Sequence, residues 1–210
     1  QDPGEADVEG RAREFLDEAR GLTTVKAAVD GALDVLHERI AFDRELRGKI
    51  RDAMQSNARL TARPSAAADG KRSKFDSFNN FSEKLADIPS HRFLALMRGA
   101  RQGMLRSELE VDDASLIDTI VAKYLKVAAS PFEPYIRRAA GAAYVESLRP
   151  QSEERVINGV RKTAEEHAIK VFCDNAHALY LEPAAGPVRV LAIEAGLDDQ
   201  CAVALVDADG

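Results

Sequence analysis

Cations are concentrated between residues 59 and 106. This segment has a net charge of +6, whereas residues 1–58 carry −4 and residues 107–210 carry −8. Clustered Lys and Arg side chains bind nucleic-acid phosphates by releasing condensed counterions. We expect the phosphate contacts to be made by Lys71, Arg72, Lys74, Arg92, Arg98 and Arg101. The same charge pattern is also that of a solvated helix face and loop, and this alternative stays open.

A second group of charged residues lies near the end of the sequence. Glu194, Asp198 and Asp199 place three carboxylates within six residues. Carboxylate oxygens hold divalent metal ions, and without such an ion they repel phosphate. Because Asp is also a frequent turn residue, we expect a turn here and no metal or other cofactor.

His91, Arg137 and Arg138 are further candidates for contact with nucleic acid. His91 follows an expected helix start, where an imidazole can meet a phosphate or donate a hydrogen bond within the fold. Arg137 and Arg138 fall within an expected helix, and a solvated helix surface explains them as well. We favour the structural interpretation for all three residues.

Cysteine and the other histidines indicate no catalytic or zinc site. Cys173 and Cys201 are isolated in the sequence, without a CxxC partner, so we expect two free thiols. No nucleophile or carboxylate stands at a catalytic spacing from the remaining histidines, His37, His167 and His177.

A predicted helix positions the three arginines of the basic segment. Pro89 and Ser90 suit its first turn, where Pro loses no needed hydrogen bond and Ser can cap. Its apolar stripe is expected to consist of Phe93, Leu94, Leu96 and Met97. Arg92, Arg98 and Arg101 then fall mainly on the other face.

Hydrophobic periodicity predicts a mainly α-helical protein. Helices are expected over residues 7–20, 25–40, 43–57, 112–128, 134–148 and 152–181, with Pro150 ending the fifth and Ser152 capping the sixth. Residues 59–70 suggest a loop or irregular strand, and residues 104–111 a short strand. Phe75, Phe78 and Phe81 are expected to pack in the core, although aromatic rings beside cations can also stack on bases. Residues 188–193 and 201–206 are expected to form a β-hairpin.

Composition favours a globular protein, with 45% hydrophobic and 30% charged residues among 210. No apolar run approaches the roughly 20 residues of a membrane helix, and no secretion signal is recognisable. We therefore expect a cytoplasmic protein. Since the chain starts with Gln and stops at Gly210, we also expect it to be part of a longer protein.

Two stretches of the basic segment resemble the bacterial Tex family of RNA-binding transcription accessory proteins. They are Lys74–Leu85, with sequence KFDSFNNFSEKL, and Ile88–Gly99, with sequence IPSHRFLALMRG. The resemblance extends over most of the chain and is most specific in residues 74–105 and 164–210. It implies a helical scaffold that binds RNA or other nucleic acid and acts alongside RNA polymerase.

The last part of the chain resembles the entry into a ribonuclease-H-like domain of YqgF type. The long helix from Ser152 looks like the family's connector, on the residues Glu165, Ala168, Ile169, Val171, Phe172, Asn175 and Leu179. The hairpin looks like the first two strands of that domain, so we expect a boundary between residues 1–183 and 184–210.

The sequence departs from the family's pattern where nuclease chemistry would lie. Family members typically have Asp-Pro-Gly after the first strand and Arg-Thr-Gly-Cys before the second, whereas this chain has Glu194-Ala195-Gly196 and Asp198-Asp199-Gln200-Cys201. We interpret the site as degenerate and incomplete and expect no enzyme. A metal-dependent nuclease or resolvase, and a pure protein-interaction scaffold, remain the alternatives.

Overall fold

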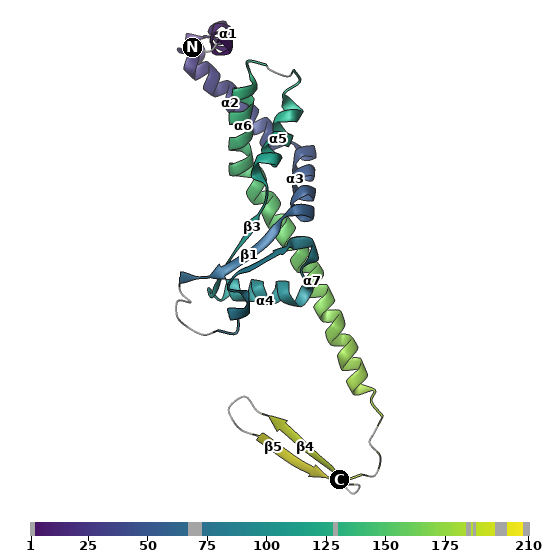
Figure 1. Ribbon diagram of the computed structural model, residues 1–210. Coiled ribbons are helices and arrows are strands. Elements are labelled where there is room, and N and C mark those ends of the chain that lie inside the picture. The colour runs from purple at the N-terminus through teal and green to yellow at the C-terminus, as the bar shows by residue number, and fades with distance from the viewer. Residues whose placement is uncertain are drawn as a thin grey trace. The chain divides into compact units, whose positions relative to one another are not determined.

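The computed structural model describes residues 3–66, 73–127, 130–183, 186, 188–195 and 201–207. The chain divides into two units, Gln1–Ala168 and Ile169–Gly210, and the long helix α7, Arg149–Tyr180, contributes residues to both. Figure 1 shows the helices and strands of each unit. The first unit contains the small sheet and the helix that carry most of the described cations of the basic segment.

Three helices precede the sheet, and polar caps set where two of them begin. They are α1, Pro3–Arg13, α2, Val25–Ala41, and α3, Arg44–Asn57. The Thr24 hydroxyl accepts a hydrogen bond from the Ala27 amide, and the Asp43 carboxylate accepts from the amides of Glu45 and Leu46. These caps confirm the predicted starts of the second and third helices.

The first helix is shorter than predicted. It ends at Arg13, and the amides of Asp17 and Leu22 then exchange backbone hydrogen bonds of 3.0 and 2.9 Å. The Asp17 carboxylate also accepts from the Ala19 amide, and Gly21 has a φ of 79°. An Asp side chain that bonds nearby amides offers the backbone an alternative to the helix, which explains the early end.

An antiparallel sheet with the strand order β2-β1-β3 follows α3. Its strands are β1, Arg59–Pro64, β2, Phe81–Lys84, and β3, Leu105–Glu110. The stretch predicted as a loop or irregular strand therefore contains the central strand, while β3 confirms the predicted strand. Leu60 lies opposite Leu109 in the register, and both side chains are buried.

Helix α4, Ser90–Arg101, packs against one face of this sheet (Figure 1). The prediction that Ser90 caps it is wrong, because Pro89 occupies the cap position and no side chain bonds the first amides. Pro89 has an extended backbone, and its carbonyl accepts from the amides of Arg92 and Phe93. Ser90 is thus already the first helical residue.

The phenylalanines pack in the core as predicted. Phe75, Phe78 and Phe81 are all buried, and the rings of Phe78 and Phe81 meet edge to face with centroids 5.6 Å apart. From α4, Phe93 and Leu96 are fully buried among them. Burial of large apolar side chains is the main source of stability in such a core.

The rest of the first unit is helical, and two predictions about it are wrong. The elements are α5, Asp113–Tyr124, α6, Glu133–Ala143, a π-helical turn, Tyr144–Leu148, and then α7. Pro150 does not end the helix, and Ser152 is a buried residue within α7 rather than a cap. The Arg149 amide bonds the Tyr144 carbonyl, five residues back. This wider turn precedes a proline that lacks an N–H and would crowd the carbonyl four residues before it.

The second unit contains the predicted hairpin. β4, Val190–Ala195, pairs antiparallel with β5, Cys201–Val206. Apolar side chains are exposed on both strands, including Leu191, Ile193 and Val203. The chain is therefore mainly helical with small antiparallel sheets, as predicted, and no described helix is long and apolar enough to span a membrane.

Candidate nucleic-acid interface

Helix α4 presents Arg98 and Arg101 to solvent. Phe93, Leu96 and Gly99 occupy the side of the helix that faces the core. Because Arg98 and Arg101 are three residues apart, they share the exposed side. Neither arginine has an ion-pair partner within the part of the chain that the structure describes.

Gly99 brings Lys74 close to the same end of α4. A Cβ atom at Gly99 would lie 2.7 Å from Cδ1 of Leu105 and 3.1 Å from Cδ1 of Phe75, so helix, strand and aromatic ring meet there. Lys74 is exposed, and its ammonium nitrogen lies 5.3 Å from the centroid of the Phe75 ring. Lys74 precedes Phe75 and Arg98 precedes Gly99, and it is Phe75 and Gly99 that pack against each other.

Arg92 is already held within the protein. Its guanidinium forms an ion pair of 2.5 Å with Glu83 and lies 5.3 Å from the centroid of the Phe81 ring. A phosphate would have to compete with the Glu83 carboxylate for this side chain. Arg92 therefore differs from Arg98 and Arg101, although the sequence placed all three in one group.

The remaining candidates are spread over different environments. Lys71 and Arg72 lie outside the described residues. His91 is exposed at the start of α4. Arg137 and Arg138 are paired with carboxylates of α5, α6 and α2, namely Asp118, Glu133 and Asp30. The hydrogen bond that Arg137 donates to the Asp118 carboxylate raises the pKa of Arg137 above its ordinary value.

The predicted acidic group is described only in part. Glu194 lies in β4 opposite Ala202 and is exposed, whereas Asp198 and Asp199 lie outside the described residues. Among the residues with a described position, no three His, Cys, Asp or Glu side chains gather closely enough to hold a metal ion. Cys173 and Cys201 are free and exposed, as predicted.

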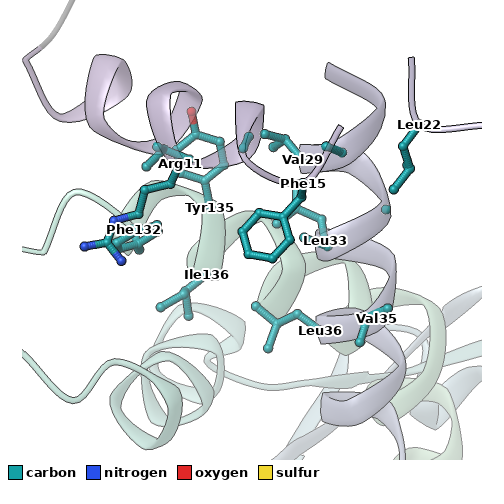
Figure 2. Close-up of a pocket in the computed structure, with 15 residues that line it drawn as sticks. Arg11, Phe15, Leu22, Val29, Leu33, Val35, Leu36, Phe132, Tyr135 and Ile136 are labelled. Carbon is teal, nitrogen blue, oxygen red and sulfur yellow. The ribbon is translucent and has the colours of Figure 1, made fainter. Parts of the chain in front are cut away.

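The first unit also contains an apolar pocket of about 700 Å³ between α1, α2 and α6. Figure 2 shows Phe15, Leu33 and Ile136 pointing into it, with Arg11 and Tyr135 at its side. Among the described residues, its lining includes no Asp, Glu, His or Cys. It therefore offers mainly apolar contact, with Arg11 and Tyr135 as its two polar side chains.

Three exposed arginines of the sheet, Arg59, Arg63 and Arg106, were not singled out from the sequence. Arg63 of β1 and Arg106 of β3 lie directly opposite each other in the register. The signal that could have found Arg63 is the alternation of Arg59, Leu60, Thr61, Ala62 and Arg63, which is the period of a half-buried strand. All three belong to the basic segment at residues 59–106.

Most of the chain matches a known protein family and several curated relatives. Residues 4–172 match the family described as Tex central region-like. Protein tex of Bordetella pertussis is 31% identical over 212 residues, and Protein YhgF of Escherichia coli is 30% identical over 208 residues. Each match covers 95% of this chain and 27% of the relative.

A relative from Neisseria gonorrhoeae, named Transcriptional accessory protein Tex, is 29% identical over 211 residues, covering 97% of this chain and 27% of that protein. The chain thus spans about a quarter of the length of these relatives. The family match includes all of the described α4 and the sheet with its basic side chains. Since it extends over well more than half of the sequence, this protein belongs to the Tex family.

Proposed function

We propose that this segment is a helical scaffold of a transcription accessory protein and that it contributes auxiliary phosphate contacts to bound RNA. The contacts are assigned to Lys71, Arg72, Lys74, Arg92, Arg98 and Arg101. The observation that carries the proposal is the group formed by Lys74, Arg98 and Arg101. All three cations are exposed. Arg98 and Arg101 lie in the C-terminal half of α4, and Lys74 directly precedes Phe75, whose ring packs against Gly99 of that helix. None has a carboxylate partner among the described residues.

Contacts of this kind position RNA without reading its sequence. Lys and Arg side chains on a helix surface reach phosphate oxygens, which are the same at every nucleotide. Helix α4 is a firm base for them, because Phe93 and Leu96 are fully buried beneath it. The energetic contribution is electrostatic, so it decreases as the salt concentration rises.

The wider role rests on the name of the gonococcal relative, a transcriptional accessory protein. We place this protein in the cytoplasm with RNA polymerase as its partner, and we assign it binding rather than turnover, with no cofactor. The hairpin begins a ribonuclease-H-like domain in this proposal. Glu194 is the one described carboxylate of the acidic group, and it is exposed without a metal-binding cluster around it in the described part of the chain.

A protein-interaction scaffold is the second candidate function, and the apolar pocket favours it. Phe15 and Val35 line that pocket, and they are 69% and 67% exposed, respectively. Exposed apolar side chains around a groove are typical of contact sites between proteins. In that case the cations of α4 would bind RNA no better than other surface cations do.

The test is a fluorescence anisotropy titration of a labelled single-stranded RNA with the 210-residue chain. The variant changes Lys74, Arg98 and Arg101 to Gln. A matched control changes Lys26, Arg44 and Arg155 to Gln, three exposed cations outside the basic segment. We expect at least about tenfold weaker binding for the first variant and little change for the control. Equal losses in both folded variants would refute the proposed site, and no binding by the unaltered chain would leave the scaffold function.

A further inference from the structure

The outer face of the sheet carries two arginines in direct opposition. Leu60 of β1 and Leu109 of β3 are buried on the face toward α4, and Leu105 of that face would touch a Cβ at Gly99. Successive side chains of a strand alternate between faces. Arg63 and Arg106, which are an in-register pair, therefore share the opposite face.

Opposition of two like charges is an unfavourable arrangement in a sheet. Directly opposed residues of an antiparallel pair have Cβ atoms about 4.5–5.5 Å apart, and like charges at that distance destabilise the pairing. Glu108 forms an ion pair with Arg106, with 2.7 Å between Nε and Oε1. Arg63 has no ion-pair partner within the described residues. Two guanidinium groups thus face one carboxylate.

The other charges of this face lie farther along the strands. Arg59 is opposite Glu110, and it donates hydrogen bonds to the hydroxyl and carbonyl oxygens of Ser82. Lys84 is opposite Arg59 on the other side of β1. The positive charge that no carboxylate balances is therefore that of the pair of Arg63 and Arg106, at the end of the sheet where β1 ends and β3 begins.

This end of the sheet adjoins the cations of α4. The Ser65 amide donates a hydrogen bond of 3.0 Å to the Met104 carbonyl, which ties the chain after β1 to the turn before β3. The same turn follows Arg101, the last residue of α4. Arg63 and Arg106 therefore lie at the end of the sheet that α4 leads into.

We infer that Arg63 and Arg106 form a phosphate clamp for the RNA backbone on the outer face of the sheet. This inference rests on the proposed function and adds two contacts to it. A guanidinium group binds a phosphate through two parallel N–H donors, and an anion between two arginines removes their mutual repulsion. Their exposure supports such a role, since the Arg106 side chain is 78% accessible.

A phosphodiester fits this pair better than an acidic peptide does. Both arginines belong to residues 59–106, in which the net charge is +6, so a continuous polyanion would gain from several cations at once. A carboxylate side chain of a protein partner would gain mainly from the pair itself. A polyglutamate peptide, used as a second probe, distinguishes binding of phosphodiester from binding of carboxylate.

The test uses the full 210-residue chain and the same labelled RNA. One variant is Arg63→Gln with Arg106→Gln, a second is Arg63→Lys with Arg106→Lys, and the matched control is Arg44→Gln with Arg155→Gln. We expect RNA affinity to fall about fivefold or more in the Gln variant and less in the Lys variant, which keeps charge but loses the paired donors. Because a repulsive pair is removed, the Gln variant should melt no lower than the unaltered chain.

Three results would decide the matter. Unchanged RNA affinity in the folded Gln variant, with loss in the variant of Lys74, Arg98 and Arg101, would overturn the clamp and leave the proposed function standing. Loss in neither variant would overturn both. Binding of polyglutamate as tight as that of RNA, and lost in the Gln variant, would overturn the assignment to phosphate.

Discussion

The Tyr144 hydroxyl donates a hydrogen bond of 2.5 Å to the Asp113 carboxylate, which joins the π-helical turn to the first turn of α5. Arg149 donates to the other oxygen of the same carboxylate. The Tyr144 side chain is fully buried, and burial, followed by the bond to Asp113, raises its pKa. The wide turn that carries the helix past Pro150 is thus fixed by a side-chain network.

Removing the Tyr144 hydroxyl tests this network. Tyr144→Phe should lower the free energy of unfolding by about 1–2 kcal/mol, because the ring still fills the core while the carboxylate loses one donor. Urea denaturation followed by circular dichroism measures the change. Tyr135→Phe is the control, since no hydrogen bond of the Tyr135 hydroxyl is found among the described residues. Equal stability of Tyr144→Phe and the unaltered chain would contradict the role of the network.

Asp43 should make stability depend on pH. Burial acts to raise its pKa, but hydrogen bonds from Lys123, the Leu46 amide and Tyr124 outweigh burial and lower the pKa below its ordinary value. A carboxyl with a lowered folded-state pKa stabilises the fold above its unfolded pKa, near 3.9. That contribution is lost as the pH falls through the lower, folded-state pKa.

Asp43→Asn separates this charge from the helix cap, because Asn also caps helices. We expect about 1 kcal/mol lower stability at pH 7 and a smaller further loss between pH 7 and pH 3 than in the unaltered chain. Urea midpoints at the two pH values provide the measurement. Asp52→Asn, at an exposed site paired with Arg51, should retain the pH dependence of the unaltered chain. A variant of Asp43 with that same dependence would argue against the assignment.

Gly99 should not tolerate a side chain. Ala is favoured over Gly in a helix by about 1 kcal/mol, yet at this position its Cβ would overlap Leu105 and crowd Phe75. Gly99→Ala should therefore destabilise the chain by about 1–3 kcal/mol. Gly159→Ala in α7 is the matched control, because a Cβ there meets no atom within 4 Å, and it should be stabilising. Thermal melts that rank the two substitutions in the reverse order would contradict the close contact of α4 with β3.

The hairpin should promote self-association. Leu191, Ile193, Val203 and Leu205 are each more than half exposed on a two-stranded sheet, which is marginal in water and has two unpaired edges. A chain that ends at Pro183 should remain monomeric at higher concentration than the 210-residue chain and should keep its melting temperature. Light scattering with size-exclusion chromatography, together with thermal melts, checks both points. Unfolding of the shortened chain would show that the hairpin supports the helices.

Local signals in the sequence were sufficient for much of the fold. The helix starts predicted near residues 25 and 43 are correct, because the caps that Thr24 and Asp43 form there each depend on one side chain and the next few amides. The stop predicted at Pro150 failed because the π-helical turn before it depends on tertiary contacts of Tyr144 with Asp113. Proline chemistry alone does not reveal such a turn.

The sequence was sufficient to predict the positive charge of the candidate site, but not which side chains pair with each other there. Net charge located the basic segment, and the helical pattern placed Arg98 and Arg101 on an exposed side of α4. The pairing of Arg92 with Glu83 and the opposition of Arg63 and Arg106 both require the strand register, which joins residues far apart in the sequence. Because residues 59–70 were predicted to be a loop or irregular strand, no strand register was available from which to derive these two pairings.

The most direct measurement of the central claim is the salt dependence of RNA affinity. For single-stranded nucleic acid, the logarithm of the binding constant falls with that of the salt concentration with a slope of about −0.7 for each phosphate contact. Changing Lys74, Arg98 and Arg101 to Gln should therefore reduce the slope by about 2, whereas changing Lys26, Arg44 and Arg155 should leave it unaltered. Identical slopes for the folded unaltered chain and the first variant would contradict phosphate binding at α4.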